Sequence, residues 1–255
     1  MSINKKTGNS HGKDAVKENP MTCEEVMSEL ESLATEQTKK IYRAHGVHDP
    51  HFGVPTTAMR QIAKKIKRNQ PLAEQLYATG NYDAMYFAGM IADPKVMTAD
   101  GFERWMDAAY FYMLSDYVVA VSLAETDYAQ EVADKWIHSG EELRMSAGWA
   151  CYEWLLGSRP DSEFNLEKIK TMLAMVAETI HNQPTRTRYS MNGFVIAAGV
   201  SFLPLHEEAM KTAVKIGKVN VSSEKGECSV PVAEDAIRKA KDKGRLGFKR
   251  KSVRC

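Results

Sequence analysis

The chain has 255 residues, of which 44% are hydrophobic and 26% are charged, and its net charge is +1 at neutral pH. This hydrophobic content is enough for a substantial core and excludes an intrinsically disordered protein. The longest apolar run, residues 193–205, is too short to cross a membrane, and the first twenty residues carry no segment typical of a signal peptide. We therefore expect a soluble, cytoplasmic protein of one large or two small domains, with no membrane association.

Cysteine and histidine spacing gives no metal signature. The four cysteines, Cys23, Cys151, Cys228 and Cys255, are widely scattered, which favours free thiols in a reducing compartment. Three histidines recur every third residue within residues 45–51, but this stretch is rich in glycine and proline and lacks the further ligands of a zinc site. We expect neither a metal nor a cofactor.

The N-terminal region is expected to be a tail followed by a helix. Residues 1–20 are polar and lack aromatics, which predicts disorder. The spacing of Thr22 and Glu25 is that of a capping box, and it marks the start of a helix. One helix closing near Gly46 is expected from apolar residues on one face: Val26, Leu30, Leu33 and Ile41.

The rest of the chain shows helical periodicity and no strand-like alternation. After Pro55 an amphipathic helix carries a basic outer face made of Arg60, Lys64, Lys65, Lys67 and Arg68. From Pro71 onward, short helical units alternate with turn signals such as those at 79–81, 157–160 and 203–204. Helix pairs joined by short loops predict an all-α fold, either a stacked solenoid or a compact bundle, and a solenoid has a concave surface that suits a long polyanion.

The stretch from Phe102 to Leu123 differs from an ordinary core helix. It is aromatic-rich and almost uncharged, and Asp116 lies in an apolar run four residues after Tyr112, so the ring and the carboxylate share a helix face. An unpaired buried carboxylate costs several kcal/mol. Asp116 is therefore expected either to cap a helix beginning at Tyr117, together with Ser115, or to face a cationic ligand.

Two further features leave alternatives open. Arg144 begins an otherwise apolar helix, where it is either a phosphate contact or an ordinary surface arginine. The four tryptophans, at 105, 136, 149 and 154, are expected in the core.

Positive charge gathers at the C-terminus. Residues 238–255 contain nine Lys or Arg and one acid, Asp242, which suits a solvated tail or a polyanion-binding surface equally well. Before this block, residues 219–228 are expected to form a polar loop, and Ser229 and Pro231 can open a helix that runs through Ile237. The final stretch, residues 244–255, is expected to be flexible alone and ordered on a partner.

No Walker loop, dinucleotide fingerprint or nucleophile elbow is present. Four segments, in their order and spacing, instead resemble the AlkD family of DNA alkylation repair enzymes, which are glycosylases built from HEAT-like repeats: FGVPTTAMRQIAKKI (52–66), YFYMLSDYVVAVSL (110–123), EELRMSAGWA (141–150) and TRYSMNGFVIAA (187–198). The resemblance covers about residues 22–217. It implies an α-solenoid of antiparallel HEAT-like helix pairs with a concave basic groove over residues 21–217, followed by a basic extension over 218–255.

The resemblance also implies roles for individual residues. The family's catalytic aspartate falls on Asp116, its DNA-contacting arginine on Arg144, and two of its tryptophans on Tyr112 and Phe194. The implied reaction is hydrolysis of the N-glycosidic bond of a cationic N3- or N7-alkylated purine, without lyase activity. Asp116 would stabilise the positive charge that develops on the sugar, and the two aromatic rings would contact the sugar and the charged nucleotide.

A monomer that binds double-stranded DNA, alkylated and branched DNA included, follows from this assignment. Phosphate contacts are expected from Arg144 and from the basic residues Arg60, Lys64, Lys211, Lys215, Arg245, Lys249, Arg250 and Lys251. Two alternatives remain: a member that binds DNA structures without excising bases, and a helical-repeat scaffold for other proteins, in which Asp116 would be a cap.

Overall fold

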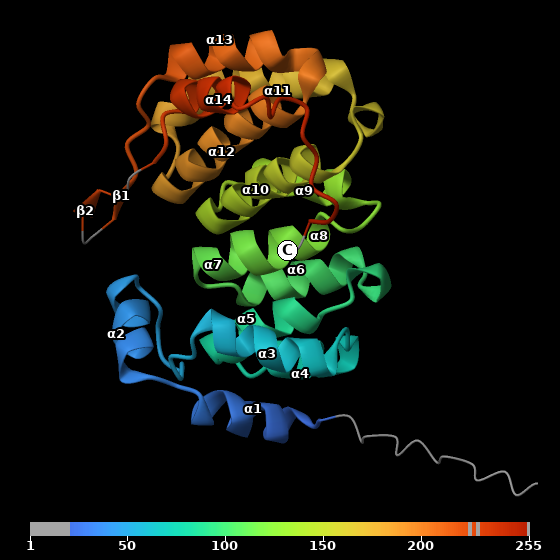
Figure 1. Cartoon of the computed structure of the whole chain (residues 1–255), viewed down its shortest axis with the longest axis vertical. Coiled ribbons are helices and arrows are strands. Elements are labelled where there is room, and N and C mark those ends of the chain that lie inside the picture. The colour runs from blue at the N-terminus through green and yellow to red at the C-terminus, as the bar shows by residue number, and fades with distance from the viewer. Residues whose placement is uncertain (1–20, 224–225, 228–229, 254–255) are drawn as a thin grey trace, which may run out of the picture.

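A computed structural model of the chain describes residues 21–223, 226–227 and 230–253. Within these residues the regular secondary structure is helical apart from one two-stranded hairpin (Figure 1). The first half contains α1 (Cys23–Ser32), α2 (Glu36–Ala44), α3 (Thr56–Ile66), α4 (Gln70–Tyr77), α5 (Tyr82–Ile91), η1 (Pro94–Val96), α6 (Ala99–Ala108), α7 (Tyr112–Leu114), η2 (Ser115–Val119) and α8 (Ala120–Leu123). The second half contains α9 (Ala129–Ile137), α10 (Glu142–Ser158), η3 (Asp161–Glu163), α11 (Leu166–Thr179), η4 (Ile180–Asn182), α12 (Thr185–Ser201), η5 (Leu203–Leu205), α13 (His206–Ile216), β1 (Ser222–Ser223), β2 (Gly226–Glu227) and α14 (Ala233–Asp242).

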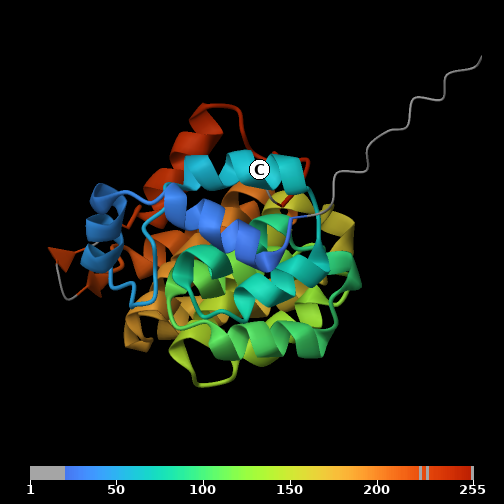
Figure 2. The ribbon, with the colours of Figure 1, turned by 90° about the horizontal axis from the view of Figure 1, so that it is seen from below.

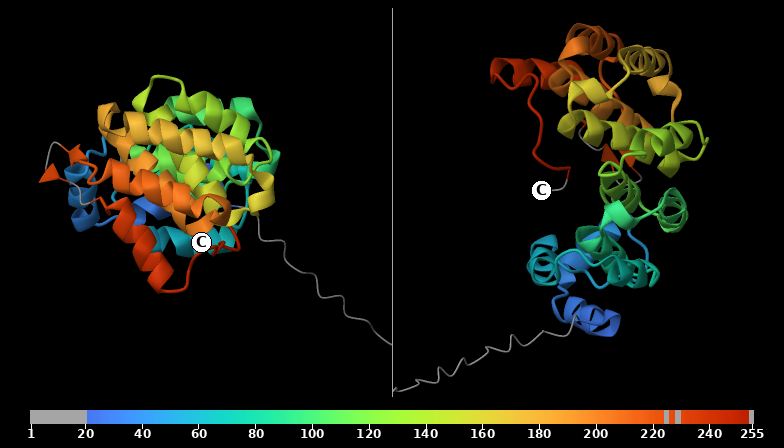
Figure 3. Two further views of the ribbon diagram at one scale, coloured as in Figure 1. Left: turned by 90° about the horizontal axis from the view of Figure 1, so that it is seen from above. Right: turned by 90° about the vertical axis from the view of Figure 1, so that its right-hand side faces the viewer.

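The helices stack in two layers. In the layer that we call the inner layer, α3, α5, the α7–η2–α8 helix, α10, α12 and α14 pack one on the next. A second layer of α4, α6, α9, α11 and α13 packs behind them, and α13 lies at the end of the stack (Figures 1 and 3). The all-α fold and the predicted α-solenoid of HEAT-like helix pairs are confirmed.

Close packing within this stack depends on glycines, which have no side chain. A Cβ on Gly148 of α10 would lie 2.8 Å from the carbonyl oxygen of Ala133 on α9, and a Cβ on Gly89 of α5 would lie 2.7 Å from Val118. Glycine at these positions lets neighbouring helices approach at backbone distance. Trp105, Trp136 and Trp149 are buried as predicted, whereas Trp154 is only half-buried.

The N-terminal prediction is partly wrong. The capping box of Thr22 and Glu25 is confirmed, but the chain breaks between α1 and α2 instead of forming one helix. Thr35 causes the break, because its hydroxyl accepts a hydrogen bond from the Thr38 amide and starts a new helix. Leu33 and Ile41 are consequently exposed. Seen from below, α1 lies across the end of the stack and α2 projects to one side (Figure 2). The predicted disorder of residues 1–20 lies outside the described residues.

The C-terminal region also departs from expectation. The polar stretch predicted as a loop contains an antiparallel hairpin, with Ser222 opposite Glu227, and α14 begins only at Ala233. The segment after α14 packs against the stack, because Gly247 N donates to Val200 O at 2.8 Å and Arg250 N donates to Gly157 O at 2.8 Å. Figure 3 (right) shows this segment running down from α14 along the side of the stack. Its predicted flexibility does not hold for residues up to 253.

Among the described residues, none of the helices is both long enough and apolar enough to span a membrane.

Candidate nucleic-acid interface

The helix from Tyr112 to Leu123 contains a wide turn at its centre. The Ala120 amide bonds to Ser115 O, five residues back, which makes η2 a π-helical turn. In an ordinary α-helix the same amide would bond to Asp116 O. Here the Asp116 carbonyl accepts a hydrogen bond from Trp154 Nε1 at 3.3 Å. Such turns often lie at functional sites, and this one joins the η2 backbone to α10.

Asp116 is buried, with 3% of its surface exposed. Ser115 Oγ donates to its Oδ1 at 2.8 Å, and Ser146 Oγ from α10 donates to its Oδ2 at 2.8 Å. Ser190 Oγ from α12 lies 3.4 Å from the same oxygen. Burial raises the pKa of Asp116 above its ordinary value, although the positive charge of Arg186 and the hydrogen bonds from the serines oppose this rise. The carboxylate lies inside a continuous helix and caps nothing, so the capping hypothesis is wrong.

The cation that faces Asp116 belongs to the protein. Arg186 Nη2 lies 3.4 Å from Asp116 Oδ2, and the guanidinium carbon stands 3.7 Å from the ring centre of Tyr112. The ring of Tyr189 contacts the same guanidinium, at 4.4 Å. The prediction that Tyr112 and Asp116 share a face is confirmed, because one guanidinium touches both. The side chain of Arg186 is only 18% exposed, so this cation is largely withdrawn from solvent.

The first turns of α10 and α12 hold Arg186 in place. It lies at the N-terminal end of α12, where Glu142 of α10 accepts a hydrogen bond from the Arg186 amide at 2.7 Å. Thr187 Oγ1 donates to the Glu142 carbonyl at 3.3 Å. These bonds fix the first turn of α12 against the first turn of α10, and they point Arg186 at η2. Its Nε is buried without a hydrogen-bond partner among the described residues, so the guanidinium is incompletely satisfied.

Phe194 does not line this site. It is 0% exposed, and its ring packs 5.1 Å from that of Trp149 and 6.3 Å from that of Tyr152. The expected contact between Phe194 and a nucleotide is therefore corrected to a core role. The physical reason is that α12 is covered on several sides by neighbouring helices, so an apolar ring in its middle is buried.

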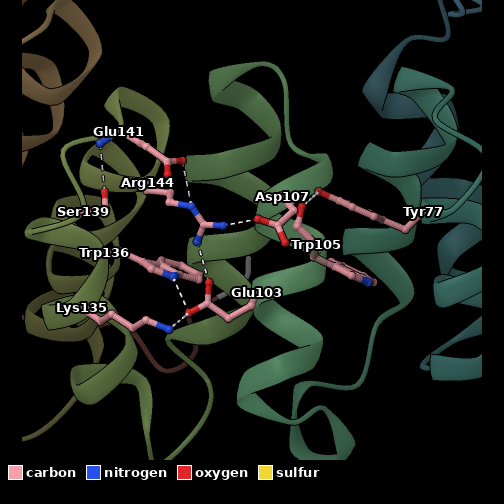
Figure 4. A network of polar contacts seen from close by, with 9 residues as sticks. All are labelled: Tyr77, Glu103, Trp105, Asp107, Lys135, Trp136, Ser139, Glu141 and Arg144. Atoms are coloured by element: carbon pink, nitrogen blue, oxygen red, sulfur yellow. Dashed lines mark hydrogen bonds and ion pairs between the residues drawn. The ribbon is translucent and has the colours of Figure 1, made fainter.

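Arg144 has structural partners instead of a free face (Figure 4). Its Nη1 donates to Glu103 at 2.6 Å, its Nε donates to Glu141 at 3.0 Å, and its Nη2 bonds to Asp107. Burial alone would lower the pKa of Arg144, but the hydrogen bond and charge of Glu103, with the charges of Asp107 and Glu141, raise it. All three guanidinium nitrogens are occupied, so the predicted phosphate contact does not fit this geometry.

Glu103 is the shared anchor of that network. It also accepts hydrogen bonds from Lys135 at 2.9 Å and from Trp136 Nε1 at 3.2 Å. Burial by itself would raise the pKa of Glu103, but the hydrogen bonds from Lys135, Arg144 and Trp136 outweigh it and lower the pKa. The network joins α6, α9 and α10, and its role is to hold helix pairs together.

The predicted DNA-binding residues fall into two groups. Within the described residues, no salt bridge joins a carboxylate to Arg60, Lys64, Arg245, Arg250 or Lys251, and all five are exposed. The others are engaged: Lys211 pairs with Glu208 at 2.9 Å, and Lys215 pairs with Glu178. Lys249 donates to the Leu156 carbonyl at 2.8 Å and lies 2.7 Å from Asp161, so it anchors the C-terminal segment instead of facing a phosphate.

Beside Asp116, a second carboxylate lines the inner layer. Burial raises the pKa of Glu153 on α10 to about 7, the charge of Arg250 lowers it, and that of Asp116 raises it. The guanidinium of Arg250 stands 4.8 Å from the ring of Trp154. The C-terminal segment thus brings a cation to the inner layer next to Asp116.

The site is thus a buried aspartate that faces an arginine and two tyrosine rings within a stack of HEAT-like helix pairs. The chain belongs to the family described as DNA alkylation repair enzyme, whose pattern matches residues 26–226. The predicted membership is thereby confirmed.

The chain is also similar to a solved structure and to two bacterial proteins. A solved structure described as "a new family of proteins related to the HEAT-like repeat DNA glycosylases with affinity for branched DNA structures" is 59% identical, covers 92% of this chain and 100% of its own, and superposes with a TM-score of 0.86. The uncharacterized protein Lin0241 of Listeria innocua is 32% identical over 229 residues, which are 88% of this chain and 99% of that protein. The uncharacterized protein Lmo0209 of Listeria monocytogenes matches to the same extent.

Sequence reasoning missed the residues that surround Asp116: Arg186, Tyr189, Ser146, Ser190 and Glu153. Only one local signal pointed to any of them. Arg186 and Tyr189 are three residues apart at the start of a helix, so they share a face and can jointly present a cation and a ring. The pairing with Asp116 spans 70 residues of sequence, and no local pattern reveals it.

Proposed function

We propose that the chain binds branched DNA along the inner layer of its solenoid, and that it does not release alkylated bases while Arg186 occupies Asp116. The relative that is 59% identical is described as having affinity for branched DNA structures. Its coverage of 92% of this chain supports carrying that property to this chain.

One observation carries the second half of the proposal: the internal ion pair of Asp116 and Arg186. In glycosidic hydrolysis a carboxylate stabilises positive charge that develops on the sugar, and it must reach that sugar to do so. In this protein the carboxylate already faces a guanidinium, which also covers the rings of Tyr112 and Tyr189. A cationic nucleotide would need the same carboxylate and the same ring faces.

Exposed cations on the inner layer support backbone binding. Arg60 and Lys64 lie on α3 near one end of the stack, and Arg245, Arg250 and Lys251 lie on the segment that runs from α14 along the side of the stack (Figure 3). Lys and Arg contacts to phosphate release counterions and carry no sequence information by themselves. Binding is therefore expected to be independent of sequence and to weaken steeply with salt.

A second candidate function, alkylpurine glycosylase, is favoured by the retention of Asp116 and an aromatic ring at Tyr112 on one helix face. It requires Arg186 to leave Asp116 when DNA binds. The unfilled hydrogen-bonding position on Arg186 Nε is the feature that supports such a movement. The scaffold alternative predicts no DNA affinity at all.

Two assays distinguish these functions. Gel shifts compare a plain duplex, a three-way junction and a four-way junction, and base release is measured on methylated duplex DNA. The wild type is expected to bind junctions more tightly than duplex and to release neither 7-methylguanine nor 3-methyladenine. Wild-type base release that is abolished in Asp116→Asn would overturn the non-excising interpretation, and the absence of any DNA shift would favour the scaffold.

A variant of the ion pair sharpens this test. Arg186→Ala removes the cation from the carboxylate and from both rings, and Arg104→Ala on α6 removes one exposed charge as a control. If Arg186→Ala releases bases while the wild type and Arg104→Ala do not, Arg186 is what blocks the chemistry.

A further inference from the structure

A cavity of about 460 Å³ lies beside the Asp116 site, between α10, α12, α14 and the C-terminal segment. Its volume is in the range of small-ligand sites, about 300–1,000 Å³. The part lined by helices is made mostly of small side chains, including Gly157, Gly193, Ala197, Ala236 and Ala240. Small residues from three helices leave the space open.

The rim of this cavity is basic. Lys239 and Lys243 reach it from the end of α14, and Arg245 and Arg250 reach it from the C-terminal segment. Within the described residues, none of the four forms a salt bridge with a carboxylate. Elsewhere on α13 and α14 the basic residues Lys211, Lys215 and Arg238 are paired with acids.

One carboxylate, Glu153, lines the same cavity. It carries less than a full negative charge near neutral pH, because burial raises its pKa to about 7. Four cations that form no salt bridge within the described residues, against this single group, leave a net positive site that selects an anion.

An exposed aromatic ring completes the cavity lining. Phe248 is 63% exposed and stands at the mouth, on the same segment as Arg245 and Arg250. Exposed apolar rings among unpaired cations are the combination that single-stranded nucleic acids use, with phosphates on the cations and a base stacked on the ring. A paired duplex keeps its base faces stacked, so only an unpaired nucleotide offers a face to Phe248.

The segment that carries these groups has a defined conformation. Gly247 has a φ of +74° and donates to Val200 O, and a Cβ there would lie 2.9 Å from Leu203. The positive φ favours glycine at this position. Together with the anchoring contacts of Lys249 and the bond from Arg250 N to Gly157 O, this turn fixes Phe248 over the cavity.

From this geometry we infer that the cavity binds one unpaired nucleotide of a single-stranded arm in branched DNA. Lys239, Lys243 and Arg245 hold its phosphates, and Phe248 stacks on its base. This inference rests on the proposed function, because it names the part of a branched substrate that the protein recognises. The phosphates of the duplex arms bind to the exposed cations elsewhere on the inner layer.

The test measures fluorescence anisotropy with two matched DNAs: a fork with one single-stranded arm, and the same fork with that arm made duplex. In the wild type the single-stranded arm is expected to tighten binding. Lys239→Ala/Lys243→Ala/Arg245→Ala should abolish that difference and reduce the salt slope for the single-stranded fork by about 0.7 for each phosphate that the variant no longer neutralises. Phe248→Ala should weaken binding of this fork by about fivefold or more.

A steric variant and a charge control complete the set. Gly157→Leu fills the cavity without a clash at its Cβ, which would meet nothing within 4 Å, and it removes no charge. It should also abolish the preference for the single-stranded arm. The matched control, Lys95→Ala/Arg104→Ala/Lys170→Ala, removes three exposed charges outside the inner layer and should leave the preference intact.

The outcomes separate this inference from the proposed function. If the wild type binds both forks equally and tightly, or if the cavity variants keep the preference, the nucleotide site is refuted while branched-DNA binding stands. If the wild type binds neither fork nor a junction, branched-DNA binding itself is refuted, and the nucleotide site that rests on it is refuted too. If the control variant loses the preference as fully as the cavity variants, the effect comes from overall charge and the site is again refuted.

Discussion

Glu153→Gln tests the electrostatics of the inner layer most directly. The Glu153 carboxyl lies on α10 opposite Gly193, where a Cβ would stand only 2.3 Å from its Oε2. Its pKa is raised from 4.5 to about 7, chiefly by burial and further by the charge of Asp116, while Arg250 acts in the opposite direction. The substitution keeps the shape of the side chain and removes its titration.

The expected magnitude follows from linkage between folding and proton binding. Because the pKa is higher in the folded state, the folded protein holds this proton more tightly than the unfolded chain does. The stabilisation is complete below pH 4.5, and it disappears as the pH rises through 7. At pH 8 the charged carboxyl costs at most about 3 kcal/mol at 1.36 kcal/mol per pKa unit. Water at this half-buried side chain weakens the effect, so the expected cost lies between about 1 and 3 kcal/mol.

Urea unfolding at pH 5, 6, 7 and 8 measures this cost. Glu153→Gln should come closest to the wild type at pH 5 and should exceed its free energy of unfolding at pH 8 by about 1–3 kcal/mol. Glu131→Gln, at an exposed position on α9, controls for the removal of one acid and should track the wild type at every pH. If Glu153→Gln is instead less stable than the wild type at pH 8, the carboxylate is held ionised by Arg250 and the reasoning is refuted.

Two further substitutions test the ion pairs around the site. Arg186→Ala should lower the free energy of unfolding by about 2–4 kcal/mol, because it leaves the Asp116 carboxylate buried without its cation and removes two ring contacts. In urea unfolding, the decrease should be smaller at pH 5 than at pH 8, because the carboxyl cannot take up a proton at pH 8. An equal decrease at both pH values would argue against the pairing. Arg144→Ala should cost about 1–3 kcal/mol in the same assay while leaving the junction affinity of the folded protein unchanged. A weakened gel shift in a fully folded Arg144→Ala protein would restore the phosphate contact that the sequence suggested.

The parts of the fold that the sequence predicts are those governed by local chemistry. Thr22 and Glu25 form the expected capping box because both partners lie within one turn. The burial of Asp116 in an apolar stretch is likewise visible from its neighbours. The break at Thr35 was missed because a threonine cap competes with helix continuation, and the apolar spacing across it looks unbroken.

The parts that the sequence does not predict depend on distant segments. Arg186 reaches Asp116 only because α10 and α12 pack with their first turns together. The C-terminal segment resembles a solvated basic tail in composition, yet Gly247 and Arg250 bond it to helices 47 and 93 residues away in sequence. Composition describes the charge of such a segment, whereas its position is decided by backbone hydrogen bonds to other helices.

Residue 186 therefore decides what the Asp116 site can do. A buried carboxylate with two aromatic faces attracts a cation, whether that cation is a guanidinium or an alkylated purine. A tethered guanidinium is present at an effective concentration that a rare lesion cannot match, so it holds the site unless DNA binding pulls it away. Arg60, Lys64 and the cations that follow α14 do not take part in this pair. The same solenoid can consequently bind DNA through its surface whether or not Asp116 is accessible, and affinity for DNA and base excision become separable properties of one fold.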